Sequence, residues 1–207
     1  DRCLAVDEQG NLIDGDQIMA ACGLDRKKRG ILPQNTIVAT VMSNLGLHMF
    51  AQEYGLNLEC TDVGDRNVLE KMLERGYALG GEQSGHMIFR DYATTGDGQL
   101  TALQVLALLK ESGKKASEVF GTCARYPQVL INVPVADNDV KKAVMANPAL
   151  WEAVKAEEDK LAGSGRILVR PSGTEALMRV MVEAKTEEAA QQAARRLADR
   201  IPSLAEG

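Results

Sequence analysis

The 207-residue chain lacks several features that define large classes of proteins. No apolar run reaches the length of a membrane-spanning helix, and the start Asp1-Arg2-Cys3 does not have the form of a signal peptide. The four cysteines form no C-x-x-C pair, which argues against a zinc site or a redox motif. We therefore expect reduced thiols, a cytoplasmic protein and no membrane partner.

The chain also lacks an excess of positive charge. Its net charge is −5 and its pI is about 5.2, which argues against a general nucleic-acid or anionic-membrane surface. With 45% hydrophobic and 26% charged residues, the composition is that of a soluble globular protein with one large or two small domains. A site for an anionic ligand must then be locally basic.

Strand-like and helix-like segments alternate over residues 1–112. Thr36–Val41 is a β-branched run typical of a buried parallel strand, and Leu4–Val6 is expected to be a short buried strand. Asp14 or Asp16 is expected to cap the first helix, and Asp97 the apolar helix Leu100–Leu109. This order predicts an α/β domain with a mixed, largely parallel sheet, and ligands of such sheets bind at the loops beyond the strand ends.

The pattern changes beyond Lys115. The expected order is a strand at 129–134, a helix capped by Asp139 and broken near Pro148, two strands at 167–169 and 177–182, and a helix over 187–201. This order predicts a small α+β domain with an antiparallel sheet. We expect domains at 1–112 and 122–207, with Trp151 in the core or between the domains.

One loop of the second domain has residues suited to phosphate. Arg170-Pro171-Ser172-Gly173-Thr174-Glu175 lies between the two expected strands, and Arg179 follows shortly after. Guanidinium groups bind phosphate oxygens in a forked geometry, glycine permits close approach of an anion, and consecutive backbone N–H groups can form an anion nest. The alternative is a plain Pro-Gly hairpin turn whose arginines lie in solvent.

A second loop lies in the first domain, at Gly80-Gly81-Glu82-Gln83-Ser84-Gly85-His86. Glu82 accepts hydrogen bonds and Ser84 both donates and accepts them, so the pair suits sugar hydroxyls. His86 could donate to a phosphate or move a proton near neutral pH. The alternative is an ordinary loop with His86 packed on the sheet edge.

Three further segments carry little information alone. Asp62–Asn67 is interpreted as a turn in which Asp65 caps a helix and Arg66 lies in solvent, and Arg26–Gly30 as a solvated helix end. Asp1-Arg2 precedes the first strand.

The four motifs together are specific. Asp-Arg at 1–2, Thr-x-Val-Gly-Asp-Arg at 61–66, Gly-Glu-Gln-Ser-Gly-His at 81–86 and Arg-Pro-Ser-Gly-Thr-Glu at 170–175 follow one another at domain-like spacing. This pattern closely resembles the α-D-phosphohexomutases, and among them the bacterial phosphoglucosamine mutase subfamily. The resemblance covers essentially the whole chain and implies the family's third and fourth domains.

The resemblance also implies a reaction and residue roles. In this family a phosphoserine gives its phosphoryl group to a hexose phosphate, and the other phosphate of the resulting bisphosphate returns to serine. A hexosamine phosphate is the implied substrate. The implied roles are catalysis for Arg2 and His86, metal binding for Asp1, sugar recognition for Gly64, Asp65, Arg66, Glu82 and Ser84, and phosphate binding for Arg170, Ser172, Gly173, Thr174 and Arg179.

The sequence departs from the family pattern in two ways that matter. The family's magnesium loop reads Asp-x-Asp-x-Asp-Arg, and only Asp1-Arg2 is present here, which leaves the implied Mg²⁺ site incomplete. No Ser-His-Asn-Pro nucleophile loop occurs, and the chain does not begin with methionine. We expect a C-terminal half whose partner is the missing N-terminal domains and which is inactive alone. The alternatives are a phosphomannomutase or phosphoglucomutase fragment, a non-catalytic sugar-phosphate binding module, and a structural domain pair that binds nothing.

Overall fold

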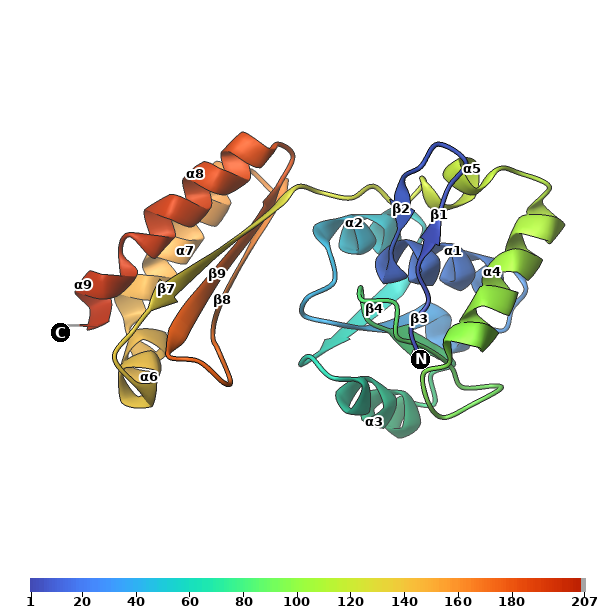
Figure 1. Cartoon of the computed structure of the whole chain (residues 1–207), viewed down its shortest axis with the longest axis horizontal. Helices are drawn as coiled ribbons and strands as arrows, with labels where there is room; N and C mark the ends of the chain where they lie inside the picture. Colours follow the sequence, from blue (N-terminus) through green and yellow to red (C-terminus); the bar gives the residue numbers. More distant parts are fainter. Residues whose placement is uncertain (206–207) are drawn as a thin grey trace. The chain divides into compact units, whose positions relative to one another are not determined.

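The computed structural model describes residues 1–205 and divides into two compact units, Asp1–Arg125 and Tyr126–Gly207 (Figure 1). The division falls later than the 112–122 segment expected from the sequence. A short helix, α5 (Ala116–Phe120), belongs to the first unit, where the Gln17 side chain donates to the carbonyl of Phe120 at 3.3 Å. Within residues 1–205, no helix has the length and apolar character needed to cross a bilayer.

The first unit contains a mixed four-stranded sheet in the order β4-β3-β5-β6. Its strands are β3 (Thr36–Thr40), β4 (Asn57–Thr61), β5 (Leu79–Gly81) and β6 (Met87–Phe89). β3 is parallel to both β4 and β5, whereas β6 runs antiparallel to β5. The sheet is therefore mixed and largely parallel, as predicted.

Helices cover both faces of this sheet. They are α1 (Gly15–Lys28), α2 (Leu45–Glu53), α3 (Asp65–Arg75) and α4 (Gly98–Ser112), with a 3₁₀ turn at Pro33–Asn35. Successive side chains of a strand point to opposite faces, so the apolar strand β3 needs cover on both. Ile37 and Ala39 pack in the cluster that includes α1, α2 and α4, whereas Val38 packs with Val68 and Met72 on the face that α3 covers.

Capping residues fix where these helices begin and end. Asp14 forms a capping box with Gln17 at the start of α1, and the Asp97 carboxylate accepts from two N–H groups at the start of α4. Gly113 ends α4 in the left-handed conformation at φ 64°. Asp97 was predicted in this role, and Asp14 is one of the two residues proposed to cap α1.

A small hairpin precedes the main sheet. β1 (Ala5–Val6) pairs antiparallel with β2 (Leu12–Ile13). The prediction of a buried strand at 4–6 is wrong, because Leu4 is 51% and Val6 is 63% exposed. The prediction of a solvated basic helix end at 26–30 is wrong for Arg26, which is buried and forms an ion pair with Asp91.

The second unit contains an antiparallel sheet, as predicted, with helices packed on one face (Figure 1). Its elements are β7 (Gln128–Pro134), α6 (Asn138–Ala146), α7 (Pro148–Lys160), β8 (Gly165–Pro171), β9 (Leu177–Ala184), α8 (Glu187–Ala198) and α9 (Ile201–Ala205). The strand order is β7-β9-β8, and Val169 and Val180 point to the helices and belong to the buried core. The helix expected over 187–201 ends at Ala198, and Ile201, which is buried, begins α9.

Two expectations for the second unit need correction. Asp137, not Asp139, caps α6, because the Asp137 carboxylate accepts from the N–H groups of Asp139 and Val140. Trp151 does not lie in a core: it is 45% exposed, and its indole N–H donates to the carbonyl of Met145 at 2.9 Å. The break before Pro148 occurs as predicted, since proline begins α7 there.

Candidate functional site

The turn between β5 and β6 positions the Glu82–His86 loop. Glu82 N–H donates to the carbonyl of His86, and Gly85 N–H donates to the carbonyl of Glu82, both at 2.9 Å. Gly85 has φ 91°, and a Cβ there would lie 2.3 Å from the carbonyl oxygen of Cys3. Glycine is thus required at position 85, since the Cys3 N–H also donates to the Gly85 carbonyl at 2.9 Å.

The Glu82 carboxylate joins this loop to the loop that follows β4. Its Oε1 accepts from the Gly64 N–H at 3.0 Å, and the Ser84 hydroxyl donates to its Oε2 at 3.4 Å. Glu82 and Ser84 are each at least partly exposed. A fixed carboxylate beside a hydroxyl can bind the hydroxyls of a polyol.

His86 lies between two carboxylates. Its Nδ1 is 3.5 Å from an oxygen of Asp1, and its Nε2 is 3.7 Å from an oxygen of Asp65. The side chain is buried, and Nε2 is a buried atom without a hydrogen-bond partner in the described residues. Gly96 packs against the ring, because a Cβ on Gly96 would lie 2.1 Å from Nε2.

Arg2 and Asp1 join the same group of residues. Arg2 forms an isolated antiparallel bridge with His86, and a Cβ on Gly98 would lie 2.3 Å from the Arg2 carbonyl oxygen. Asp1 has a side chain that is 66% exposed. The first unit therefore brings together Asp1, Arg2, Gly64, Asp65, Glu82, Ser84 and His86.

The loop after β4 differs in detail from the prediction. Gly64, at φ 129°, is the N-cap of α3, and Asp65 is the first helical residue, so the prediction that Asp65 caps the helix is wrong. Arg66 has an 86% exposed side chain whose Nε donates to Glu70 at 2.7 Å. This hydrogen bond raises the pKa of Arg66. Arg66 thus lies in the first turn of α3 and in solvent, as predicted, with its guanidinium held by Glu70.

The residues present do not form a complete magnesium site. Among residues 1–205, no three His, Cys, Asp or Glu side chains are grouped closely enough to hold a metal ion. Asp1 supplies one carboxylate, whereas Mg²⁺ takes six oxygen ligands, several of them water.

The two buried cysteines are poor candidate nucleophiles. Burial raises the pKa of the Cys22 and Cys123 thiols to about 12. A thiol with such a pKa is protonated at neutral pH and is unreactive.

In the second unit, the residues from Ser172 to Ala176 connect β8 to β9. Ser172 is buried, its N–H donates to the Leu177 carbonyl at 2.9 Å, and its Oγ accepts from the Glu175 N–H at 3.3 Å. In the described part of the chain, the N–H groups of Gly173 and Thr174 donate no hydrogen bond. Two adjacent free N–H groups in a turn are suited to an anion.

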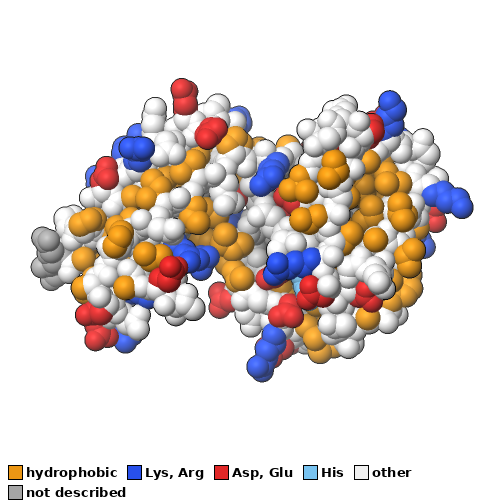
Figure 2. Space-filling model, in the orientation of Figure 1, with side chains coloured by type: hydrophobic (Ala, Val, Ile, Leu, Met, Phe, Trp, Pro, Cys, Tyr) orange, Lys and Arg blue, Asp and Glu red, His pale blue; other side chains and the backbone are white. Residues whose placement is uncertain are grey.

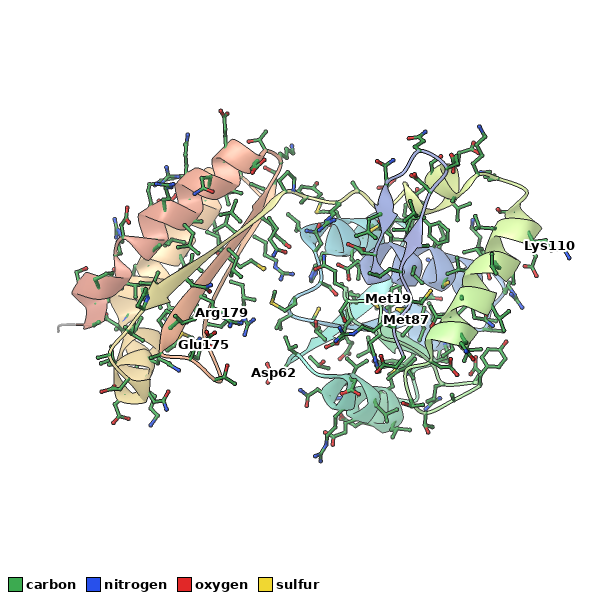
Figure 3. The ribbon with its side chains drawn as sticks, viewed as in Figure 1. Met19, Asp62, Met87, Lys110, Glu175 and Arg179 are labelled. Carbon is green, nitrogen blue, oxygen red and sulfur yellow. The ribbon has the colours of Figure 1, made fainter. Side chains whose placement is uncertain are left out.

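Arg170 and Arg179 are directly opposite each other in the β8–β9 ladder. They point away from the helices, since their neighbours Val169 and Val180 lie in the core. Burial, and then the charge of Arg179, lowers the pKa of Arg170. Arg179 donates to Glu175 at 3.0 Å, and Figure 3 shows the two side chains together near the turn.

These two guanidinium groups have unused donors. Within residues 1–205 the Arg170 side chain makes no hydrogen bond, and Nε of Arg179 is a buried atom without a partner. Like charges placed opposite each other destabilise a sheet unless an anion lies between them. The two arginines make this site locally basic. Over the face of the protein that Figure 2 shows, charged side chains of both signs are interspersed.

Gly173 is not required by the fold. Its φ is not positive, and a Cβ on Gly173 would meet no atom within 4 Å. The absence of a side chain there leaves space above the free N–H groups, which an anion could occupy.

Sequence reasoning missed Gly96 and Gly98, whose lack of side chains places the ring of His86 and the backbone of Arg2. The signal was the Gly-Asp-Gly triplet at 96–98, which was interpreted only through the helix cap Asp97.

The structure thus consists of an α/β unit followed by an α+β unit. Each unit has a polar, glycine-containing loop at the ends of its strands. Two family models match these units: the phosphoglucomutase/phosphomannomutase alpha/beta/alpha domain III over residues 14–126, and the C-terminal domain over residues 130–200. The chain belongs to the phosphoglucomutase/phosphomannomutase family, which confirms the resemblance seen in the motifs.

Relatives within the family are named phosphoglucosamine mutases. That of Ruminiclostridium cellulolyticum is 58% identical over 91% of this chain and 42% of the relative. That of Caldicellulosiruptor saccharolyticus is 54% identical over 98% of this chain and 45% of the relative. The chain thus spans less than half of the length of these relatives.

Solved structures show the same fold. A structure of Aspergillus fumigatus N-acetylphosphoglucosamine mutase superimposes with a TM-score of 0.82 at 22% identity, over 98% of this chain and 46% of the other. Another, of the same fungal enzyme in complex with GlcNAc-6P and magnesium, has a TM-score of 0.79 at 23% identity.

Proposed function

We propose that the chain is the C-terminal half of a phosphoglucosamine mutase, which interconverts glucosamine 6-phosphate and glucosamine 1-phosphate. The observation that carries the proposal is the pair of opposed arginines beside two free N–H groups, Gly173 and Thr174. This arrangement suits the dianionic phosphate of a sugar phosphate. The high identity to relatives of that name supports the choice of sugar.

Each loop has a role in this proposal. Arg170, Ser172, Gly173, Thr174 and Arg179 bind the phosphate that does not react, and Glu82 and Ser84 bind sugar hydroxyls. Gly64, Asp65 and Arg66 shape the approach to the sugar. Arg2 and His86 act at the reacting phosphate, where a histidine beside two carboxylates can hold a proton.

The reaction needs groups that this chain does not supply. A phosphoserine transfers its phosphoryl group to the free sugar oxygen, which gives a bisphosphate and a serine hydroxyl. The phosphoryl group at the other end then returns to that hydroxyl. Mg²⁺ would neutralise phosphate charge during such transfers, and Asp1 would supply one of its ligands. The N-terminal domains of the parent supply the serine and the remaining ligands, so the chain alone is inactive.

The binding half of the proposal is tested by titrating the ¹⁵N-labelled 207-residue chain with glucosamine 6-phosphate. The amide signals of Gly173, Thr174 and Ser84 are expected to shift. Arg170→Ala is expected to abolish the shifts in the second unit, since it removes a guanidinium donor. Arg195→Ala, which removes an exposed arginine of α8 in the same unit, is the matched control and should bind normally.

Three outcomes would contradict parts of the proposal. Unchanged binding by Arg170→Ala would exclude the phosphate loop as the site that binds the substrate's phosphate. Mutase turnover by the isolated chain would refute its dependence on the N-terminal domains. Tighter binding of mannose 6-phosphate or glucose 6-phosphate than of glucosamine 6-phosphate would favour a phosphomannomutase or phosphoglucomutase instead.

A further inference from the structure

A buried lysine contacts the phosphate loop from α6. Lys141 is only 5% exposed, and its Nζ donates to the carbonyl oxygen of Ser172 at 2.8 Å. Lysine is rarely buried to this extent without a charged partner. In the part of the chain that the structure describes, Lys141 forms no ion pair, and its acceptor is a neutral carbonyl.

The neighbouring lysine provides a comparison. Lys142, one position along α6, has a 79% exposed side chain and an ordinary surface ion pair with Asp139 at 3.1 Å. Lys141 is thus distinguished by its place in the fold and not by the composition of its helix. A buried ammonium group beside an anion-binding loop is expected to have an anion as its counter-charge.

The hydrogen bond to Ser172 also orients the next peptide group. In a trans peptide the C=O and N–H bonds point in opposite directions, and no cis peptide occurs in residues 1–205. When Lys141 holds the carbonyl of Ser172 toward α6, the N–H of Gly173 must point away from α6. That N–H is one of the two free donors of the loop.

We infer that Lys141 is a positioning residue for the substrate's phosphate: it fixes the Ser172–Gly173 peptide so that the Gly173 N–H faces the anion, and adds a third positive charge to those of Arg170 and Arg179. This inference rests on the proposed function and deepens it. Lys141 acts through the loop backbone and through charge.

The test compares orthophosphate affinity and thermal stability of the 207-residue chain and its variants. Lys141→Met retains the apolar stem and removes the charge and the donor, so the dissociation constant for orthophosphate is expected to rise about tenfold. The melting temperature is not expected to fall in parallel, because apolar replacement of a buried charge is often neutral or stabilising. Lys141→Arg should recover most of the affinity, and Lys142→Met is the control that should not change it.

A measurement on the unmodified chain covers the case in which Lys141→Met does not fold. In a chain labelled with ¹⁵N-lysine, the Nζ signal of Lys141 should move when orthophosphate saturates the site. A stationary signal, or unchanged affinity in Lys141→Met, would overturn the inference while leaving the proposed function intact if Arg170→Ala still abolishes binding. Failure of the unmodified chain to bind orthophosphate would overturn both.

Discussion

At the scale of single residues, glycines separate what the fold requires from what a ligand requires. Gly85 and Gly96 are fixed by the fold, since a Cβ at either position would meet another residue at 2.3 or 2.1 Å. Gly173 has open space around the position of a Cβ. A glycine that the fold does not need is a candidate for contact with something outside the chain.

Gly173→Ala is therefore expected to leave the stability of the second unit within about 0.5 kcal/mol of the original. The added methyl group would occupy the space proposed for the phosphate, so orthophosphate affinity should fall about tenfold or more. Urea unfolding and calorimetric titration measure the two quantities. A loss of stability equal to the loss in binding energy would show that the fold does require glycine here.

Gly96→Ala is expected to have the reverse effect of Gly173→Ala: it should disturb the fold and not the phosphate loop. Its Cβ would overlap Nε2 of the His86 ring, so the imidazole must move from its place between Asp1 and Asp65. We expect destabilisation of the first unit by about 1–3 kcal/mol, the usual range for overpacking. The ring proton signals of His86 should shift strongly, and the amides of the 170–175 loop should not. Unmoved His86 signals would contradict the packing described here.

At the scale of elements, the arginine pair of the β8–β9 hairpin is expected to lower the stability of the hairpin and to favour phosphate binding. Arg170 and Arg179 repel each other across the ladder, so Arg170→Gln is expected to raise the free energy of unfolding by about 0.5 kcal/mol at low salt. The same change should weaken phosphate binding. Added orthophosphate should raise the melting temperature of the original chain but not of Arg170→Gln. A variant that is both less stable and still stabilised by phosphate would refute this account.

A second element-scale prediction concerns the contact between α7 and α8. The Glu157 side chain is only 8% exposed and accepts hydrogen bonds from Arg196 at 2.8 Å and from Lys160 at 2.7 Å. The Arg196 guanidinium, with a smaller contribution from Lys160, holds the pKa of Glu157 below its ordinary value of 4.5.

Because the pKa of Glu157 is lower in the folded state, its stabilisation is present above pH 4.5 and is lost as the pH falls through the folded-state value. Glu157→Gln should therefore lower stability at pH 7 and flatten the acid side of the stability curve of the second unit. Urea unfolding at a series of pH values measures this. Parallel curves for the variant and the original chain would contradict the assignment.

These elements also show what the sequence could predict. The largely parallel first sheet could be predicted from local patterns, because Ile37, Val38 and Ala39 are apolar and buried on both faces. The antiparallel second sheet could be predicted from the succession of strands and helices, whereas the order of the strands within each sheet was not predicted. The cap of α6 was missed because Asp137 and Asp139 are chemically equivalent in sequence, and only the backbone path selects Asp137. Lys141 was missed because nothing local distinguishes it from Lys142. Its burial depends on a loop about 30 residues away.

At the scale of the whole molecule, the two units have separate cores. One cluster contains residues such as Ile37, Leu79 and Phe89, and the other contains Val169, Val180 and Leu197. Among residues 1–205, no residue belongs to both clusters. Each unit therefore has the hydrophobic core that independent folding requires.

We expect a polypeptide of residues 126–207 to fold alone and to retain the phosphate loop, since Lys141, Ser172 and both arginines lie within it. Its amide spectrum should reproduce the signals of this unit in the longer chain, apart from residues near the new terminus. Its orthophosphate affinity should agree within about threefold, a difference below 1 kcal/mol. Chelation of metal ions should not change that affinity, because the phosphate donors are arginines and N–H groups. If the polypeptide folds but does not bind orthophosphate, the donors named here are insufficient, and the first unit must contribute to the phosphate site.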